Sequence, residues 1–292
     1  MEAIRKTFFE NGGLQIGSFE SRPVSDACGD VERQSLNAIV LPFAGVFSKH
    51  DGPGRHVIGT PSHAVFIAAD TPYRIGFPGA IGDRALTLRF GHDIAAHHLD
   101  PRRNDGALAS HGLLPAGAMM LRNLLWSRLK RGEVDEFERE TLGLDLLYLA
   151  LASVRTTALP VRRAAHLRRL RSLERVKEAV AVAPAERWTI AKLSRVANLS
   201  PYHLCHVFRE MVGTSIYDYV LQERLAHALD AVLDGGDLTT IAFDAGFASH
   251  SHFTARFRSF FGHTPTALRR SVSAAQVCEL RKIMTAHRGV PT

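Results

Sequence analysis

Two stretches of the sequence follow one pattern, residues 190–213, IAKLSRVANLSPYHLCHVFREMVG, and residues 238–262, LTTIAFDAGFASHSHFTARFRSFFG. The matching positions lie 48 apart before the turn and 49 after it: Leu193 with Ile241, Ala197 with Ala245, Leu204 with Phe253, Phe208 with Phe257 and Gly213 with Gly262. The one inserted residue falls in the turn, so the helical periodicity on either side is kept. This pattern predicts a duplicated helix-turn-helix unit.

In the first unit, Thr189 is expected to cap one helix, and Ser200 followed by Pro201 to start the next. The second helix has two faces at steps of three and four residues. Its inward face is predicted to hold Leu204, Val207, Phe208 and Met211. Its outward face is predicted to hold Tyr202, Cys205, His206 and Arg209.

The second unit repeats this arrangement. Asp237 is expected to cap its first helix, and Gly246 to form its turn. Four aromatic residues are predicted to point inward: Phe253, Phe257, Phe260 and Phe261. The outward positions of the same helix are His250, Ser251, Thr254, Ala255 and Arg258.

Residues 215–233 carry an apolar stripe at helical spacing, which predicts one continuous helix between the units. Such a helix would hold the units at a fixed separation, and the major groove of DNA returns to one side every roughly 34 Å. Helix pairs with short turns also occur in proteins that never touch DNA. The polar, arginine-bearing outer faces and the net charge of +7 favour a nucleic-acid partner.

An ordered set of residues near the C-terminus resembles the signature of the AraC/XylS family of bacterial transcription regulators. The set consists of Ile241, Ala242, Gly246, Phe247, Phe253, Phe257, Gly262, Pro265 and Arg269, and residues 200–215 resemble the family's first unit. The resemblance covers about the last hundred residues. It implies a bipartite domain whose two recognition helices enter neighbouring segments of the major groove of promoter DNA and usually recruit RNA polymerase.

The resemblance also assigns roles to single residues. The base-reading positions fall on Tyr202, Cys205, His206, His250, Ser251 and Ala255, which the outward face extends to Thr254. Phosphate contacts are expected from Lys192, Arg195, Arg209, Arg256 and Arg258. Because Cys, Ser and Ala cannot form bidentate contacts with bases, we expect readout through thymine methyl groups, water and DNA shape. His203 and His252, each beside an inward anchor, are expected to pack.

The N-terminal half has a different sequence pattern. Between about residues 36 and 90, short apolar runs alternate with Gly and Pro, which predicts an antiparallel sheet or barrel; residues 113–154 are helical in pattern. This half is similar to the family's cupin-like β-barrel with dimerisation helices. The expected fold is therefore α+β, divided into a sensing and dimerisation domain (1–158), a basic linker (159–172), a DNA-binding domain (173–272, its first helix near 173–182) and a tail (273–292).

The helix expected over residues 137–154 has two leucine stripes, one for the barrel and one for a second copy of the chain: Leu142, Leu146 and Leu149, and Leu144, Leu147 and Leu151. Residues that could line an effector pocket in the barrel are Phe43, Phe47, Phe66, Tyr73, Phe77 and Phe90, with Arg74, Arg84 or Arg89 as an anion anchor. For most of these aromatic residues, plain barrel core is the preferred interpretation.

A cupin-type metal enzyme fused to the DNA-binding module is the alternative. Histidines are plentiful (His50, His56, His63, His92, His97 and His98), but none forms the His-x-His pair of a cupin metal site in the barrel region, so neither metal nor cofactor is expected. A DNA-repair module with a four-cysteine zinc site is excluded by the three cysteines, Cys28, Cys205 and Cys278. With no bilayer-length apolar run and no signal-peptide core at the start, a cytoplasmic homodimer without membrane contact is expected.

Overall fold

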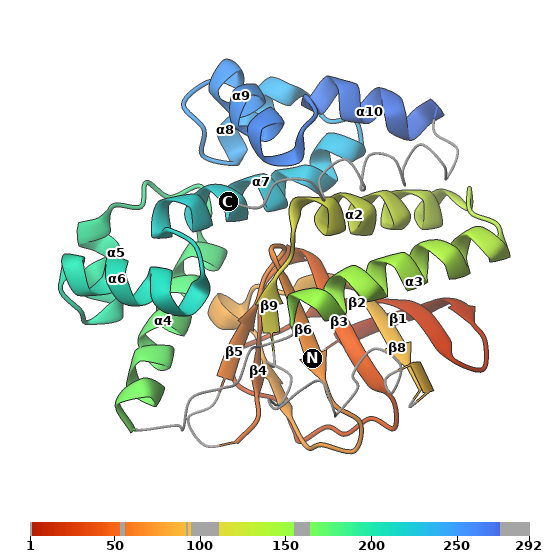
Figure 1. The fold of residues 1–292 in the computed structure, drawn as a ribbon, viewed down its shortest axis with the longest axis horizontal. Coiled ribbons are helices and arrows are strands. Elements are labelled where there is room, and N and C mark those ends of the chain that lie inside the picture. The colour runs from red at the N-terminus through yellow and green to blue at the C-terminus, as the bar shows by residue number, and fades with distance from the viewer. Residues whose placement is uncertain (1, 53–55, 92, 95–110, 155–163, 275–292) are drawn as a thin grey trace.

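The computed structural model describes residues 2–52, 56–91, 93–94, 111–154 and 164–274 (Figure 1). The predicted mixed α+β architecture is confirmed, with strands before residue 114 and helices after it. The strands are β1 (Glu2–Glu10), β2 (Leu14–Arg22), β3 (Asn37–Gly45), β4 (Phe47–His50), β5 (His56–Gly59), β6 (His63–Ile67), β7 (Arg74–Gly76), β8 (Asp83–Phe90) and β9 (His111–Leu113). The described strands form two antiparallel sheets, ordered β1-β2-β8-β3-β6-β9 and β5-β4-β7.

The hairpin of β1 and β2 was not predicted, because the strands were expected to begin near residue 36. Its signal is the turn between the strands, Asn11-Gly12-Gly13. The Asn11 side chain accepts hydrogen bonds from the backbone N–H groups of Gly13 (3.1 Å) and Leu14 (2.9 Å). Asn-Gly sequences favour tight hairpin turns, so this signal was available in the sequence.

The two faces of the larger sheet have different surroundings. On β8, Leu86, Leu88 and Phe90 are buried in the main apolar core, while the alternate residues Thr87 and Arg89 face a cavity. Two helices cover the core face, α2 (Ala116–Arg131) and α3 (Glu136–Ser153). The helices and the cavity thus lie on opposite faces of this sheet.

On α3 the predicted second leucine stripe is wrong. Leu147 and Leu151 are buried, as are Leu142 and Leu146, so the helix turns both predicted stripes largely toward the sheet and α2. The exposed apolar residues of α3 are instead Phe137, Leu144 and Tyr148, with 77%, 40% and 47% of their surface exposed. The error arises because a helix this apolar packs on the sheet and α2 at once, which widens its buried face.

The C-terminal helices are α4 (Ala164–Val182), α5 (Ile190–Ala197), α6 (Pro201–Val212), α7 (Ile216–Leu233), α8 (Leu238–Asp244), α9 (His250–Phe261) and α10 (Pro265–Ala274). Helix α4 begins nine residues before Leu173, so residues 164–172 of the expected linker are helical. Its first turns are rich in Ala, Leu and Arg, which have high helix propensity. Residues 159–163 and the tail from 275 onward lie outside the described residues.

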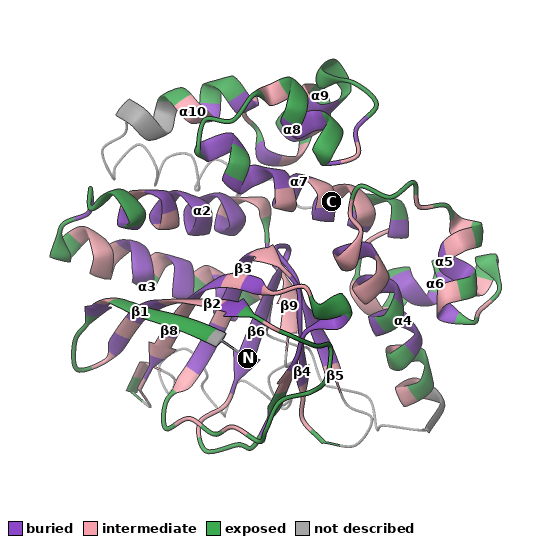
Figure 2. Ribbon diagram, turned by 180° about the vertical axis from the view of Figure 1, so that it is seen from behind, coloured by how far each residue is buried: buried purple, intermediate pink, exposed green. Residues whose placement is uncertain are grey.

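The C-terminal helices pack on the N-terminal half. Helix α7 lies on α2, and one apolar core contains residues of both halves (Figures 1 and 2). Lys130 on α2 donates to both carboxylate oxygens of Asp234, which follows α7, at 2.9 Å. The connecting helix is therefore held by the sheet domain as well as by its own domain.

Candidate nucleic-acid interface

The first helix-turn-helix unit, α5 and α6, is built as its sequence predicts. The Thr189 side chain accepts from the N–H of Lys192 at 3.2 Å, and that of Ser200 accepts from the N–H of His203 at 3.3 Å. Leu204, Val207 and Phe208 are buried in a core that α4, α5 and α7 share, whereas Met211 lies half-buried beside it. The opposite face of α6 exposes Tyr202, Cys205, His206 and Arg209, with Tyr202 84% exposed.

The second unit, α8 and α9, has the same geometry. Asp237 caps α8 by accepting from the N–H of Thr240 at 2.8 Å, and Gly246 takes a φ of +79° in the turn. A ladder of phenylalanine rings fills the interior, with ring centroids 5.5 Å apart between Phe253 and Phe257 and 4.6 Å between Phe257 and Phe261. Each such buried ring stabilises the unit by about 1.5–3 kcal/mol.

The outward face of α9 exposes His250, Ser251, Ala255 and Arg258, whereas Thr254 is half-buried. Thr254 Oγ1 lies 3.4 Å from His250 Nε2. The two second helices thus each present a solvent-facing row of the residues that the sequence assigns to base reading. Besides one arginine each, the rows carry Tyr, Cys and His on α6 and His, Ser, Thr and Ala on α9.

The side chains that are expected to contact phosphate differ in their exposure and in their present partners within the protein. Arg209 and Arg258 are exposed, whereas Lys192 forms an ion pair with Glu186, and Arg195 Nε donates to the Ala191 carbonyl at 3.2 Å. Arg256 is half-buried, and Nε and Nη2 of its guanidinium lie 3.4 Å from His252 Nε2 and the Tyr217 hydroxyl, respectively.

The two histidines expected to pack lie next to these rows. His203 is half-buried, whereas His252 is exposed but sets its ring edge-on against Phe247 at 5.5 Å.

Helix α7 connects the units without a break, as predicted, and its 18 residues span about 27 Å. Arg224, which the sequence analysis does not single out, holds both units on α7. The guanidinium of Arg224 donates at 2.9 Å to three carbonyls, those of Pro184, Gly246 and Glu186. Pro184 and Glu186 lie in the segment that enters the first unit, and Gly246 forms the turn of the second. One side chain therefore fixes both units relative to the connecting helix.

Gly246 adds a second constraint between the units. A Cβ at this position would lie 2.7 Å from the backbone of Ala185, closer than real contacts allow. Only glycine satisfies both the positive φ and this close approach.

A buried polar cluster joins α7 and α4 to the sheet domain. The hydroxyls of Thr60 and Ser62 both donate to Glu223 Oε1 on α7, and burial raises the pKa of Glu223. On α4, Glu174 accepts from the N–H of Ile58 and from Lys177, each at 2.8 Å.

Two histidines complete this cluster. Lys177 Nζ lies 2.9 Å from His111 Nε2, and Thr60 Oγ1 lies 2.7 Å from His63 Nδ1. Burial, followed by the nearby charge of Lys177, holds the pKa of His63 and of His111 well below the ordinary value. The cluster is therefore composed of neutral imidazoles around one buried ion pair.

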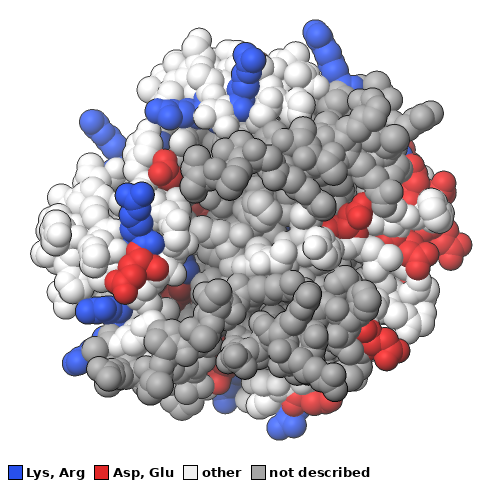
Figure 3. Space-filling model, viewed as in Figure 1, with Lys and Arg blue, Asp and Glu red and all other residues white. Residues whose placement is uncertain are grey.

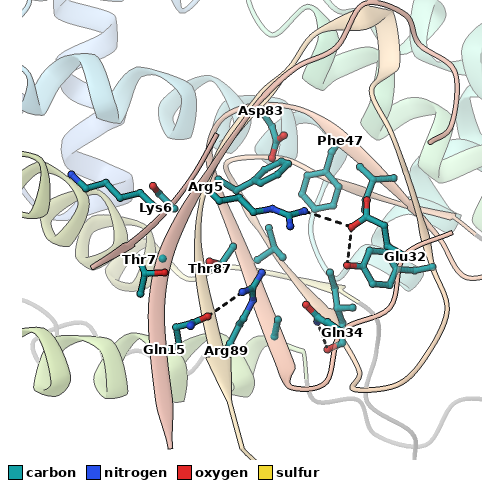
Figure 4. A pocket seen from close by; sticks show the side chains of 18 of the residues that line it. Arg5, Lys6, Thr7, Gln15, Glu32, Gln34, Phe47, Asp83, Thr87 and Arg89 are labelled. Carbon is teal, nitrogen blue, oxygen red and sulfur yellow. Dashed lines mark hydrogen bonds and ion pairs between the residues drawn. The ribbon is translucent and has the colours of Figure 1, made fainter. Parts of the chain in front are cut away.

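A cavity of about 100 Å³ lies between the two sheets, enough for several water molecules (Figure 4). Of the predicted pocket residues, Phe47, Tyr73, Phe77 and Arg89 line it. Arg89 Nη1 donates to Gln15 Oε1 at 3.0 Å.

Acidic groups line the same cavity. The Tyr73 hydroxyl donates to Glu32 Oε2 at 3.3 Å; burial and this carboxylate raise the pKa of Tyr73 to about 12. Burial also raises the pKa of Asp83 to about 6, although a hydrogen bond from Ser21 opposes the rise.

The other predicted pocket residues do not line this cavity. Phe43, Phe66 and Phe90 lie in the core under α2 and α3, and the Phe43 ring stacks on Trp126 at 4.7 Å. The reason is strand parity, because alternate residues of one strand point to opposite faces. Plain core is thus the correct interpretation for the rings of Phe43, Phe66 and Phe90. Of the arginines considered as anion anchors, Arg74 is exposed on β7, and Arg84 pairs with Asp230 at 3.3 Å.

Among the described residues, no three His, Cys, Asp or Glu side chains are grouped so that they could hold a metal ion. His92, His97 and His98 lie outside the described residues. Within that described part, no helix is long and apolar enough to cross a membrane.

Comparison with known proteins identifies the C-terminal domain. A family model described as a helix-turn-helix domain matches residues 193–271. The HTH-type transcriptional regulator GlxA of Rhizobium meliloti (strain 1021) is 30% identical over 208 residues, which cover 66% of this chain and 60% of that protein. The thermoregulatory protein LcrF of Yersinia pestis is 30% identical over 125 residues, 42% of this chain and 45% of that protein. The matches thus span less than two thirds of either relative.

The C-terminal domain is therefore a helix-turn-helix domain of the AraC type with two units, and it is similar to a part of proteins that are named as regulators. Among solved structures, ToxT from Vibrio cholerae O395 is similar at 12% identity and a TM-score of 0.36, over 90% of this chain and 99% of that one. A likeness of that strength adds nothing to the assignment. The named relatives are regulators, and neither name is that of an enzyme.

Proposed function

We propose that this protein is a sequence-specific, DNA-binding transcription regulator, an activator that recruits RNA polymerase under the control of a small-molecule effector. The observation that carries the proposal is the pair of exposed second helices, α6 and α9, held by one unbroken helix and by Arg224. Two weakly binding helix-turn-helix units that one rigid helix holds in place bind DNA with a smaller entropic cost than two separate units.

The reading faces follow from this arrangement. Tyr202, Cys205 and His206 read one segment of the major groove, and His250, Ser251, Thr254 and Ala255 read the next. Arg209 and Arg258 hold phosphates at the ends of the two helices, because both are exposed on the same faces. Lys192, Arg195 and Arg256 are phosphate contacts that exchange their present partners for DNA.

The cavity between the sheets is the proposed effector site of a cupin-like domain. It combines apolar rings, Phe47 and Phe77, with the guanidinium of Arg89 and the carboxyl groups of Glu32 and Asp83, so it suits a small ligand with an apolar body and polar groups. A ligand can act only by binding two arrangements of the protein with different affinity. The polar cluster around Glu223 is where such arrangements would differ, because it joins the sheets to α7.

The chain is proposed to act as a homodimer in the cytoplasm, where promoter DNA lies. The exposed apolar side chains of α3, Phe137, Leu144 and Tyr148, form the proposed contact with the second copy.

The test is selection of DNA from a fragmented genomic library by the full chain, followed by affinity measurement on the recovered fragments. We expect a common motif with two half-sites and an affinity at least about a thousandfold above that for random DNA. The matched control is His206→Glu with Arg258→Glu, which places negative charge on both reading faces. Recovery of random DNA, or equal recovery by the control, would contradict the proposed function.

A further inference from the structure

A hollow of about 600 Å³ opens where α4, β5 and the turn between α5 and α6 meet. Its lining is His56 from β5, Arg168, Arg169, Arg171, Ser172 and Arg175 from α4, and Asn198 and Leu199 from the turn. These residues come from the sheet domain, from the first helix of the C-terminal half and from the position just before α6. The hollow is separate from the cavity between the sheets and from the outward rows of α6 and α9.

The lining contains four guanidinium groups and no carboxylate. Arg168, Arg169 and Arg171 are exposed, and within the described part of the chain none of the four arginines forms an ion pair. Arg175 is held against the wall, since its Nη2 donates to Ser172 Oγ and to the Ala197 carbonyl at 3.1 Å each.

The nearest acidic side chains of α4 are engaged elsewhere. Glu174 is buried on its bonds to Ile58 and Lys177. Glu178 does not line the hollow, and burial raises the pKa of its carboxyl group, although the charge of His56 opposes that rise. In Figure 3, Lys and Arg side chains stand out at the end formed by α4, α5 and α6, with a few acidic ones among them, while many acidic ones lie on the opposite side, by the turn between α2 and α3.

Four like charges around one hollow repel each other and focus a positive potential inside it. Guanidinium groups suit phosphate oxygens, because their planar N–H forks donate two parallel hydrogen bonds. We propose that this hollow is a binding site for clustered phosphate groups. The proposal does not rest on the function proposed above, because it needs only the charges and shape of the hollow.

Phosphate groups of this kind have two sources, the backbone of DNA beside the first unit and a free polyphosphorylated small molecule. Either occupant would touch His56 of the sheet domain and Asn198 of the turn before α6 at the same time. Occupancy would therefore link the sheet domain to the first reading helix, at a place remote from the cavity between the sheets.

The first experiment is isothermal titration of the full chain with inorganic tripolyphosphate at low ionic strength. The test variant is Arg168→Gln with Arg171→Gln, and the matched control is Arg22→Gln with Arg33→Gln, which removes the same charge from the exposed N-terminal part of the sheet domain. Both arginines of the test pair are exposed, so neither variant should impair folding, which circular dichroism checks. We expect one-to-one binding that weakens at least about tenfold in the test variant alone, a loss of roughly 1.4 kcal/mol.

The second experiment measures how affinity for a random-sequence duplex depends on salt. If DNA is the source, the slope of log K against log salt falls in magnitude by about 1.8 for two lost phosphate contacts in the test variant alone. Tripolyphosphate binding with an unchanged slope identifies a free anion, a smaller slope without tripolyphosphate binding identifies DNA, and both changes together identify a shared site. If neither measurement separates the test variant from its control, the proposal is wrong. Should the chain not bind DNA at all, the titration alone decides.

Discussion

The hydroxyl of Thr60, next to the end of β5, donates a hydrogen bond to Oε1 of Glu223 in the middle of α7, over 2.7 Å. Both residues are fully buried. The bond ties the sheet domain to the helix that carries both helix-turn-helix units, and the Ser62 hydroxyl donates to the same oxygen. A shift of the turn between β5 and β6 would therefore be felt directly by α7.

Replacement of Glu223 tests this contact. Glu223→Ala leaves two buried hydroxyls without their acceptor, which costs about 1–3 kcal/mol for each unsatisfied group. Glu223→Gln keeps an oxygen acceptor in place. Chemical unfolding of the full chain should therefore show a lower free energy of unfolding for Glu223→Ala and a much smaller change for Glu223→Gln.

Glu223 should also make the stability of the fold depend on pH. Burial raises the pKa of Glu223 in the folded state above its value in the unfolded state, near 4.5. The contribution of this carboxyl group to the free energy of unfolding is therefore complete below the pKa of the unfolded state and is lost as the pH rises through the pKa of the folded state. Glu223→Gln should consequently gain stability relative to the wild type as pH increases from 5 to 8. Equal losses in Glu223→Gln and Glu223→Ala at every pH would contradict the role given to this carboxyl group.

Asp83 provides a second pH-dependent test, inside the cavity. Its pKa is raised from 3.8 to about 6, so the wild type loses stability as pH rises through the range between these values. Asp83→Asn keeps an oxygen that accepts the Ser21 hydroxyl, which now lies 2.6 Å from Asp83 Oδ1. At pH 7 we expect its free energy of unfolding to exceed that of the wild type by about 1–3 kcal/mol, since one pKa unit corresponds to roughly 1.4 kcal/mol.

Near pH 3.5 the difference between Asp83→Asn and the wild type should disappear. The control is Asp26→Asn, an exposed carboxylate in the loop after β2. A constant difference from pH 3.5 to pH 7 would show that the carboxyl group of Asp83 does not ionise in the fold as described.

Anchoring and readout by the two reading helices are separable. Arg258→Ala should weaken binding to selected and random DNA about equally and reduce the salt slope by about 0.9, the value for one phosphate contact. Tyr202→Ala or His206→Ala should change the preferred bases, because these side chains lie on the outward face of α6. The measurement is affinity on a panel of single-base operator variants. A base-selective loss at Arg258 with an unchanged slope would reverse the assignments.

The proposed dimer contact on α3 has a direct test as well. Leu144→Glu places a charge at the middle of the exposed apolar stripe, where it would be buried between two copies. Sedimentation of the full chain at micromolar concentration should give a dimer for the wild type and a monomer for this variant. Val24→Glu, in an exposed loop, is the control and should remain a dimer. If the wild type sediments as a monomer, α3 does not mediate dimerisation.

The predictable parts of this protein are those that depend on local signals. The caps at Thr189, Ser200 and Asp237, the turn at Gly246 and the unbroken α7 all follow from residue types at short spacings, and the structure confirms them. The exposure of the outward rows follows from helical periodicity alone, although their contact with DNA stays a prediction.

The parts that were missed depend on contacts between distant segments. Phe43 and Phe47 lie in consecutive strands that belong to different sheets, yet only Phe47 faces the cavity, because register and the two-sheet arrangement decide the face. Nothing near Arg224 in the sequence indicates that it would bind carbonyls 22 to 40 positions away. The bonds of Glu223 to Thr60 and Ser62 likewise join positions more than 160 residues apart.

The central claim is that two units on one rigid helix read one face of DNA together. Hydroxyl-radical footprinting of the full chain on a fragment recovered from the genomic library tests it most directly. We expect two protected segments on one face of the duplex, their centres one helical turn or about 10 base pairs apart. Arg224→Ala, which releases both units from α7, should weaken both protections together. A single protected segment, or two segments that Arg224→Ala leaves unchanged, would contradict the central claim.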